Sequence, residues 1–235
     1  MTKGIIYYTD NRLSEPIFTM CQKQLLKSNL PIVSVSLKPI NFGQNIVVKS
    51  KPSYISMVNQ IVLALENSKE DCVFFCEHDV LYHPSHFEFT PLKDDVYYYN
   101  MNNWRWDYPN NRIIKYDGLT SLSQLCANKK HLLNHFKKRQ EKMIEVGLEN
   151  FEAKDPHLAR LWGYEPGRKK VHNGALFDEK SADWNSLFPN IDIRHHKTFS
   201  LPKVRLKDFK QKPTGWIETT IDKIDGWDLA NIKWS

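Results

Sequence analysis

Cys72-Val73-Phe74-Phe75-Cys76-Glu77-His78-Asp79 is the stretch that decides the fold. Its first five residues form a continuous apolar run, which is typical of a central strand covered on both faces by helices. The three residues that follow are polar. Ligands of open α/β sheets bind beyond the carboxyl ends of the strands, so this triplet is the first place to look for function.

Two strand-helix units precede this strand. Residues 5–9 and 31–37 are apolar and predict strands, while residues 15–27 and 53–66 carry apolar side chains at helical spacing. Ser53 is suited to cap the second helix. Three strands separated by helices predict an α/β fold with a mixed, mostly parallel sheet.

The remainder of the chain has a different texture. Residues 96–101 and 113–116 predict strands on either side of a turn-rich segment, and residues 122–146 predict a helix with a break near Asn128. From Gly163 onwards Pro, Gly, Trp and Lys dominate. We interpret this part as a loop-rich C-terminal elaboration of one domain covering residues 1–235, with halves 1–100 and 101–235.

Composition excludes several classes of protein. The 235 residues are 41% hydrophobic and 26% charged, which excludes disordered and collagenous chains. No apolar run is long enough for a membrane span or a signal peptide. The four cysteines form no C-x-x-C pair, so we expect buried free thiols in a reducing cytoplasm, of a bacterium or of a phage-infected host cell.

Positive charge is concentrated in two blocks. The formal net charge is +6, from 33 basic and 27 acidic residues. Residues 129–142 hold six cations and one anion, and residues 194–212 hold seven cations and one anion. Either block predicts phosphate contacts, and the alternative is a solvated Lys-rich face.

The polar triplet predicts a metal site. On an extended backbone Glu77 and Asp79 point to the same side, roughly 6.5 to 7 Å apart. Carboxylates placed in this way can share one hard divalent cation, which in turn can hold a diphosphate. The structural alternative is a helix cap or a loop salt bridge.

At this point the sequence resembles a known family, the GT-A glycosyltransferases, which transfer sugars from nucleotide-diphospho-sugars. The predicted order of strand, helix, strand, helix and apolar strand, followed by an acidic triplet, resembles that of these enzymes. Residues 76–87 (CEHDVLYHPSHF) and 189–195 (PNIDIRH) resemble a family-2-like subset from bacteria and phages. The resemblance covers most of the chain and implies a Rossmann-like GT-A fold, with the nucleotide-sugar bound by residues 1–100 and the acceptor by residues 101–235.

The resemblance also implies a ligand set for Mn²⁺ or Mg²⁺. Glu77, Asp79 and His195 would bind the metal, and His78 would lie with the two carboxylates at the donor. Two alternatives stay open. Glu77 is longer than the family's usual Asp, so it could instead bind ribose or a metal-bound water, and His196 competes with His195 for the role of ligand.

The loop after the first strand corresponds to the family's nucleotide-contacting loop. Tyr8 would stack on a base, Thr9 and Asp10 would accept or donate hydrogen bonds, and Arg12 would meet phosphate. The expected donor is a nucleotide-sugar, with a UDP-sugar as first choice. A simple turn is the alternative for each residue taken alone.

The resemblance to GT-A enzymes places the proton acceptor between the triplet and His195, a segment that contains Glu152, Asp155, Glu165 and Asp178. We favour Glu165, because a carboxylate among aromatic residues is partly desolvated and its pKa is raised, with Asp178 as second choice. Glu165 could equally be an ordinary turn residue, and a retaining enzyme needs no base.

Two acceptors are compatible with the basic blocks. The first choice is a hydroxymethylated pyrimidine in phage DNA, and the alternative is a cell-surface glycan or a lipid-linked sugar. Trp104 and Trp106 are candidates for an acceptor platform, although core packing is the more common use of Trp. Two other functions stay open, a non-catalytic nucleic-acid-binding module and, ranked lower, a nucleotidyltransferase.

Overall fold

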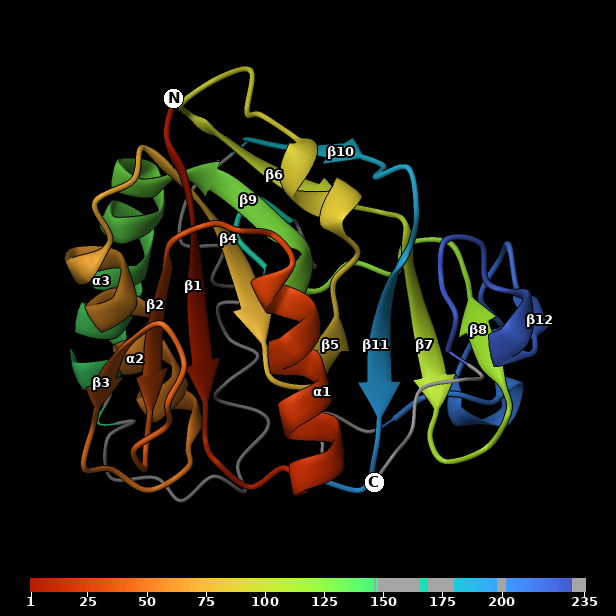
Figure 1. Ribbon diagram of the computed structural model, residues 1–235. Coiled ribbons are helices and arrows are strands. Elements are labelled where there is room, and N and C mark those ends of the chain that lie inside the picture. The colour runs from red at the N-terminus through yellow and green to blue at the C-terminus, as the bar shows by residue number, and fades with distance from the viewer. Residues whose placement is uncertain (146, 148–164, 169–179, 198–201, 230–235) are drawn as a thin grey trace.

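The computed structural model describes residues 1–145, 147, 165–168, 180–197 and 202–229. Its main sheet has seven strands in the order β10-β6-β9-β4-β1-β2-β3 (Figure 1). The strands are β1 (Lys3–Thr9), β2 (Ile32–Ser36), β3 (Gln44–Val47), β4 (Cys72–Glu77), β6 (Val96–Asn100), β9 (Leu125–Asn128) and β10 (Lys180–Trp184). Strands β3, β2, β1 and β4 are parallel, as are β10 and β6, so the expected mostly parallel α/β sheet is confirmed.

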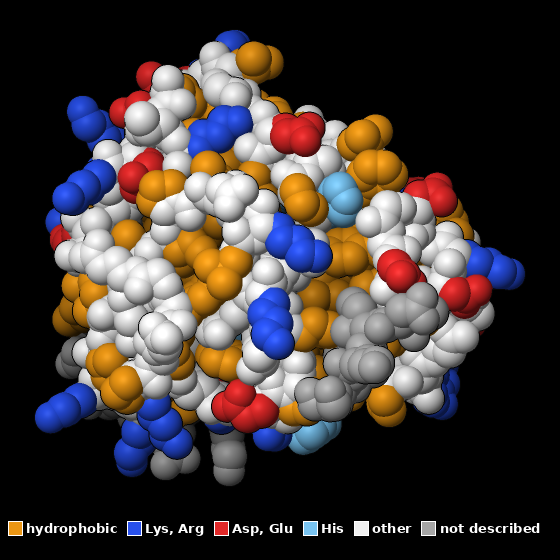
Figure 2. Space-filling model, in the orientation of Figure 1, with side chains coloured by type: hydrophobic (Ala, Val, Ile, Leu, Met, Phe, Trp, Pro, Cys, Tyr) orange, Lys and Arg blue, Asp and Glu red, His pale blue; other side chains and the backbone are white. Residues whose placement is uncertain are grey.

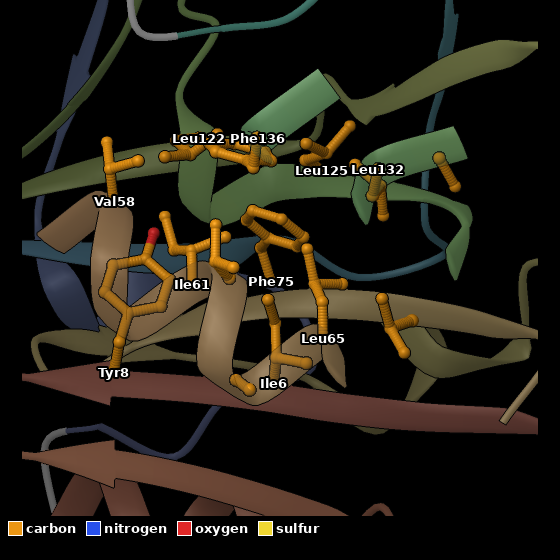
Figure 3. Close-up of a cluster of buried hydrophobic side chains, with 14 of the residues drawn as sticks. Ile6, Tyr8, Val58, Ile61, Leu65, Phe75, Leu122, Leu125, Leu132 and Phe136 are labelled. Atoms are coloured by element: carbon orange, nitrogen blue, oxygen red, sulfur yellow. The ribbon is translucent and has the colours of Figure 1, made fainter. Parts of the chain in front are cut away.

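Helices cover both faces of this sheet. Helices α2 (Tyr54–Asn67) and α3 (Lys129–Glu145) lie on one face, and α1 (Glu15–Leu26) lies on the other (Figure 1). Figure 3 shows the larger core cluster, in which Ile61 and Leu65 of α2 and Phe136 of α3 pack against Ile6 and Phe75 of the sheet. The apolar run of β4 is fully buried, as expected for a central strand.

A second sheet of five strands has the order β12-β8-β7-β11-β5. Its members are β5 (Val80–Leu81), β7 (Asn103–Asp107), β8 (Ile113–Lys115), β11 (Asn190–Arg194) and β12 (Ile217–Thr219). One face of this sheet packs against Ile17 and Cys21 of α1 and forms a separate core cluster. Short 3₁₀ turns occupy Pro84–Glu88, Leu122–Gln124, Leu206–Asp208 and Ile221–Lys223.

The structure corrects the predicted helix over residues 122–146. Residues Leu125–Asn128 form β9, which is antiparallel to both β4 and β6, and the helix begins only at Lys129. Asn128 ends the strand and caps the helix, because its side-chain oxygen accepts hydrogen bonds from the backbone N–H groups of Lys130 and His131 at 2.9 and 3.3 Å.

Other strands were absent from the sequence prediction. Strands β3 and β7 were not expected, and the part of the chain interpreted as loop-rich contains β10, β11 and β12. All four cysteines are free and buried, which confirms the reading of them as small core residues. Within the described ranges, no helix has the length and apolar character that crossing a membrane requires.

Candidate metal and donor site

The two sheets meet at Asp79. Strand β4 of the main sheet ends at Glu77, and β5 of the second sheet begins at Val80 and pairs antiparallel with β11. The backbone N–H of Ile193 donates to the carbonyl oxygen of Asp79 at 2.9 Å. This pairing places the end of β11 beside the polar triplet, although more than a hundred residues separate the two segments.

His78, Asp79 and His195 form a group that could hold a metal ion. One ligand atom from each residue lies within 4.8 Å of the other two, and Nε2 of His195 is 3.4 Å from Oδ2 of Asp79. Asp79 and His195 are buried, at 8% and 6% exposure, whereas His196 is exposed. Of the two adjacent histidines, His195 is therefore the one that faces the carboxylate.

The chemistry of these donors fits a divalent ion such as Mn²⁺. Two imidazoles and a carboxylate are ligands that Mn²⁺ accepts. Burial raises the pKa of the Asp79 carboxyl, but the hydrogen bond from His195 and the charges of His78 and Arg194 outweigh it and lower the pKa, so Asp79 is a carboxylate at neutral pH. Such a carboxylate is ready to bind a cation.

Neighbouring groups orient both imidazoles. Nδ1 of His78 lies 2.7 Å from Oγ1 of Thr9, which leaves Nε2 as the metal-binding atom of His78. The backbone N–H of Lys197 donates to Nδ1 of His195 at 3.1 Å, so a neutral His195 carries its proton on Nε2, toward Asp79. Metal binding through Nε2 therefore requires the other neutral tautomer, with the proton on Nδ1, and loss of the hydrogen bond from Lys197.

Glu77 is not one of the three clustered residues. Its Oε1 accepts a 2.6 Å hydrogen bond from the hydroxyl of Tyr8, and burial, followed by the charge of Asp79, raises the pKa of Glu77 to about 8. The expectation that Glu77 and Asp79 face one way assumed an extended backbone through both, whereas the chain turns at His78 and Asp79. A metal or ribose contact by Glu77 stays a prediction.

The loop after β1 differs in part from its predicted role. The Tyr8 ring is buried in the core, edge-to-face on Phe75, so the surface expected to stack on a base is covered by protein. Asp10 and Arg12 form an exposed ion pair with a shortest N–O distance of 2.6 Å. The buried Thr9 hydroxyl contacts Nδ1 of His78, so Thr9 supports a candidate metal ligand and does not extend into solvent.

A buried ionic network continues from the site and was missed by the sequence prediction. Arg194 lies 3.3 Å from Asp192, and Nε of Arg105 on β7 lies 3.5 Å from the same carboxylate. Burial lowers the pKa of the Arg194 guanidinium, but the charges of Asp192 and Asp79 more than compensate and raise it. The alternation Asn190, Asp192, Arg194 in β11 was the available signal, because it marks one polar face of a strand.

Glu165, whose role as the base stays a prediction, lies near the buried residues Tyr54 and Tyr99. Burial raises the pKa values of Tyr54 and Tyr99, and the charge of Glu165 raises both further. The Tyr99 hydroxyl donates to the carbonyl oxygen of Pro166 at 2.7 Å, which ties this segment to β6. Asp178 lies outside the described residues.

The candidate platform of tryptophans faces the core. Trp106 is 4% exposed and donates its indole N–H to the carbonyl oxygen of Asn110 at 2.8 Å, and Trp104 packs against the same apolar cluster. Both tryptophans therefore pack in the core, which was the alternative to an acceptor platform.

The first basic block is used within the protein itself. Arg139 is buried and donates to the Tyr54 hydroxyl at 3.1 Å, and Lys137 pairs with Glu66 at 2.7 Å. On the face shown in Figure 2, Lys and Arg side chains are scattered among neutral groups. Their arrangement on that face is not a continuous basic patch.

Comparisons with known proteins add similarities in fold. No family model matches the chain, and no curated protein matches it. The solved structures that match it include glycosyltransferases. One, involved in glycosylation of the major capsid of PBCV-1, has a TM-score of 0.45 and 8% identity, over 79% of this chain and 82% of that one.

Two further matches are similar in kind. The apo form of the glycosyltransferase GlyE from Streptococcus pneumoniae TIGR4 has a TM-score of 0.38 and 13% identity, over 65% of this chain and only 40% of that one. A mutant β1,4-galactosyltransferase 7 from Drosophila, in complex with manganese, UDP-Gal and xylobiose, has a TM-score of 0.35 and 11% identity, over 63% of each chain. The chain thus spans less than half of the pneumococcal protein. All three TM-scores are below 0.5.

Proposed function

We propose that this protein is a metal-dependent glycosyltransferase that moves a sugar from a nucleotide-diphosphate donor to a hydroxyl group. The observation that carries the proposal is the grouping of His78, Asp79 and His195, with ligand atoms within 4.8 Å, at the carboxyl edge of a mostly parallel sheet. This edge is where α/β sheets bind nucleotides. The sequence resemblance to GT-A enzymes implies the same donor chemistry.

Each group in the site has a proposed task. His78, Asp79 and His195 would hold Mn²⁺ or Mg²⁺, which when bound neutralises the charge that develops on the departing diphosphate. The Asp10–Arg12 loop lies exposed after β1 and would contact the nucleotide. Glu77, whose Oε1 accepts the 2.6 Å hydrogen bond from Tyr8, would contact the metal, a metal-bound water or the donor ribose.

Glu165 is the proposed base for the acceptor hydroxyl, with Asp178 as the alternative. Its carboxylate shares the neighbourhood of the buried tyrosines 54 and 99. General-base catalysis contributes about 10² to 10⁴ in rate, so Glu165→Gln is expected to lower kcat by that order without raising the donor KM. Unchanged turnover would remove Glu165 from this role.

The acceptor is proposed as a hydroxymethylated pyrimidine in DNA, with a cell-surface glycan or lipid-linked sugar as the alternative. Supporting the first is the net charge of +6 and the seven cations in residues 194–212. An assay of UDP release with hydroxymethylated DNA, unmodified DNA and glycans as acceptors tests the choice. The same assay, run with hexosyl and pentosyl donors, identifies the sugar.

Donor and metal binding can be tested before the acceptor is known. Thermal unfolding with a panel of nucleotide-sugars, with and without Mn²⁺, should show stabilisation only when both are present, of about 2.7 kcal/mol at a hundred times Kd. Asp79→Asn should abolish it, while Asp94→Asn, a polar change on an exposed loop, should not. A metal-independent response in the wild type would contradict the proposal, and metal-dependent binding without turnover on any acceptor would favour a non-catalytic module.

A further inference from the structure

A group of three aromatic rings lies at the outer end of the second sheet, where β8 pairs with β12. We call it the Trp216 platform: Tyr116, Phe209 and Trp216. The Tyr116 and Trp216 rings are nearly parallel, at 11° with centroids 6.0 Å apart, and Phe209 meets both edge-on. All three are partly exposed, so ring surface is left for a ligand.

Local structure holds the platform in place. Ile217 pairs with Lys115, so Trp216 and Tyr116 continue the antiparallel ladder as neighbours across the strands. Gly215 has a φ of 60°, and a Cβ on it would lie 2.2 Å from Oδ1 of Asp117. Only glycine fits there, which allows the chain to bring Trp216 onto Tyr116.

The chain that supplies Phe209 is strongly basic. Five exposed cations lie on either side of Phe209 in the sequence, and they are Lys203, Arg205, Lys207, Lys210 and Lys212. Nζ of Lys203 lies 5.6 Å from the centre of the Phe209 ring. The only acid in this stretch, Asp208, is occupied by the backbone N–H groups of Val204 and Arg205 at 3.0 and 2.8 Å. With five cations and one acid, residues 203–212 carry a formal net charge of +4.

The platform connects to the metal site through the buried ionic network. The Tyr116 hydroxyl accepts a 2.6 Å hydrogen bond from Arg105, which lies beside Asp192, and Asp192 pairs with Arg194 next to His195. Tyr116 directly follows β8, Arg105 lies in β7, and Asp192 and Arg194 lie in β11; these three strands are adjacent in the sheet. The strand register puts Tyr116 level with Asn190, five residues before His195, and two strand spacings away, so the separation is roughly 20 Å, which a bound strand of several nucleotides would span.

We propose that the Trp216 platform and residues 203–212 bind single-stranded nucleic acid, with an unstacked base on the rings and phosphates on the lysines. Exposed cations interleaved with aromatic faces are the combination that tracks a single strand. Bases inside a duplex have no free face to offer, and a neutral glycan needs no run of cations. That the bound strand carries the acceptor hydroxyl rests on the proposed transferase activity.

The test measures binding alone, without metal or donor, using fluorescence anisotropy of a labelled single-stranded oligonucleotide of about 12 nucleotides. Stacking of one base predicts that Trp216→Leu weakens binding by roughly 5- to 150-fold and that Trp216→Phe restores part of the loss. Binding of the Trp216→Leu variant that equals wild type would overturn the proposal. Equal, Trp216-dependent binding to phosphatidylglycerol vesicles or to an anionic glycan would also overturn it.

A matched pair of double variants tests the charge. Lys210→Ala with Lys212→Ala should reduce the slope of log affinity against log salt by about 1.4, which is 0.7 for each lost phosphate contact. Lys130→Ala with Lys138→Ala removes the same charge from exposed positions on α3 and should leave the slope unchanged. A reduced slope for the Lys130 and Lys138 variant, with an unchanged slope for the Lys210 and Lys212 variant, would place the binding surface on α3 and overturn the assignment.

Failure of this proposal is distinguishable from failure of the proposed function. If Trp216→Leu binds the strand normally while the Mn²⁺-dependent response to nucleotide-sugars persists, only the platform is wrong. If no nucleotide-sugar binds but the strand still binds through Trp216, only the transferase assignment is wrong.

Discussion

The adjacent residues His195 and His196 have opposite environments. His195 is 6% exposed and lies 3.4 Å from Asp79, whereas His196 is on the surface. We therefore expect His195→Ala to lower Mn²⁺ affinity by at least tenfold. Tenfold is about the lower end of the effect seen when a residue that supports a metal ligand is removed. His196→Ala is the matched control and should leave the affinity unchanged. Isothermal calorimetry measures both, and loss of affinity in His196→Ala alone would reverse the assignment.

His86 gives the protein a predictable acid sensitivity. Burial lowers its pKa to about 3, and Nδ1 is engaged by the side-chain N–H groups of Asn100 and Asn190, each at 3.0 Å. In the unfolded chain its pKa is about 6.5, so below that pH the unfolded state binds a proton that the folded state does not. The stabilisation is complete above pH 6.5 and is lost as the pH falls toward 3.

Urea unfolding between pH 7 and 4 measures this effect. The loss is about 1.4 kcal/mol per pH unit from this one group once the pH is well below 6.5. His86→Phe removes the titrating group, so the wild type should lose stability relative to this variant as the pH falls, by that amount. Glu77, whose pKa is raised to about 8, acts in the opposite direction in both proteins and cancels in the comparison. His196→Ala should keep the wild-type slope. An equally steep profile in His86→Phe would assign the acid sensitivity to other groups.

The site was only partly predictable from the sequence. Asp79 stands out because it follows a buried strand, and His195 follows from a family motif. Periodicity could not foresee that the turn takes Glu77 out of the group and brings His78 into it, because the i and i+2 rule holds only while the backbone stays extended. Arg105 and Asp192 come from strands whose pairing no local pattern specifies.

At the scale of the element, α1 and α2 provide an internal comparison of helix caps. The Ser53 side chain accepts a hydrogen bond from the backbone N–H of Ser56 at 3.1 Å, whereas Ser14, in the same position before α1, makes no such bond. Ser53→Ala should lower the free energy of unfolding by about 1 kcal/mol. Ser14→Ala should change it much less. Equal losses in thermal or urea unfolding would show that the cap bond is not what Ser53 contributes.

Elements with strong, local signals were predicted well. Helix α2 and strand β4 lie within about a residue of their predicted ranges, because their spacing and composition are decided within the segment. Strand β9 was mistaken for helix because Leu125, Cys126 and Ala127 are buried by β4 and β6, which lie far along the chain. Pairing with β4 and β6 therefore outweighs the helical pattern of the apolar residues in this segment.

At the scale of the whole molecule, the metal site exists only where the two sheets join. His78 and Asp79 follow β4 of the main sheet, and His195 follows β11 of the second. Ile193 is the link between them, because its backbone N–H bonds the carbonyl of Asp79 while its side chain, fully buried, packs in the cluster under α1. Geometry at the metal therefore depends on packing several ångströms away from it.

Ile193→Ala tests this dependence. Removing a buried isoleucine side chain costs about 2–5 kcal/mol of folding stability, and here we expect the Mn²⁺ affinity of the folded protein to fall as well, since β11 loses the packing that sets the position of His195. Ile61→Ala, at an equally buried position on α2 in the other cluster, should cost a similar amount of stability and leave Mn²⁺ affinity intact. Calorimetry at a temperature where both variants are folded separates the two effects. Equal Mn²⁺ affinity in the two variants would mean that the loop around Asp79 holds the ligands without help from the second sheet.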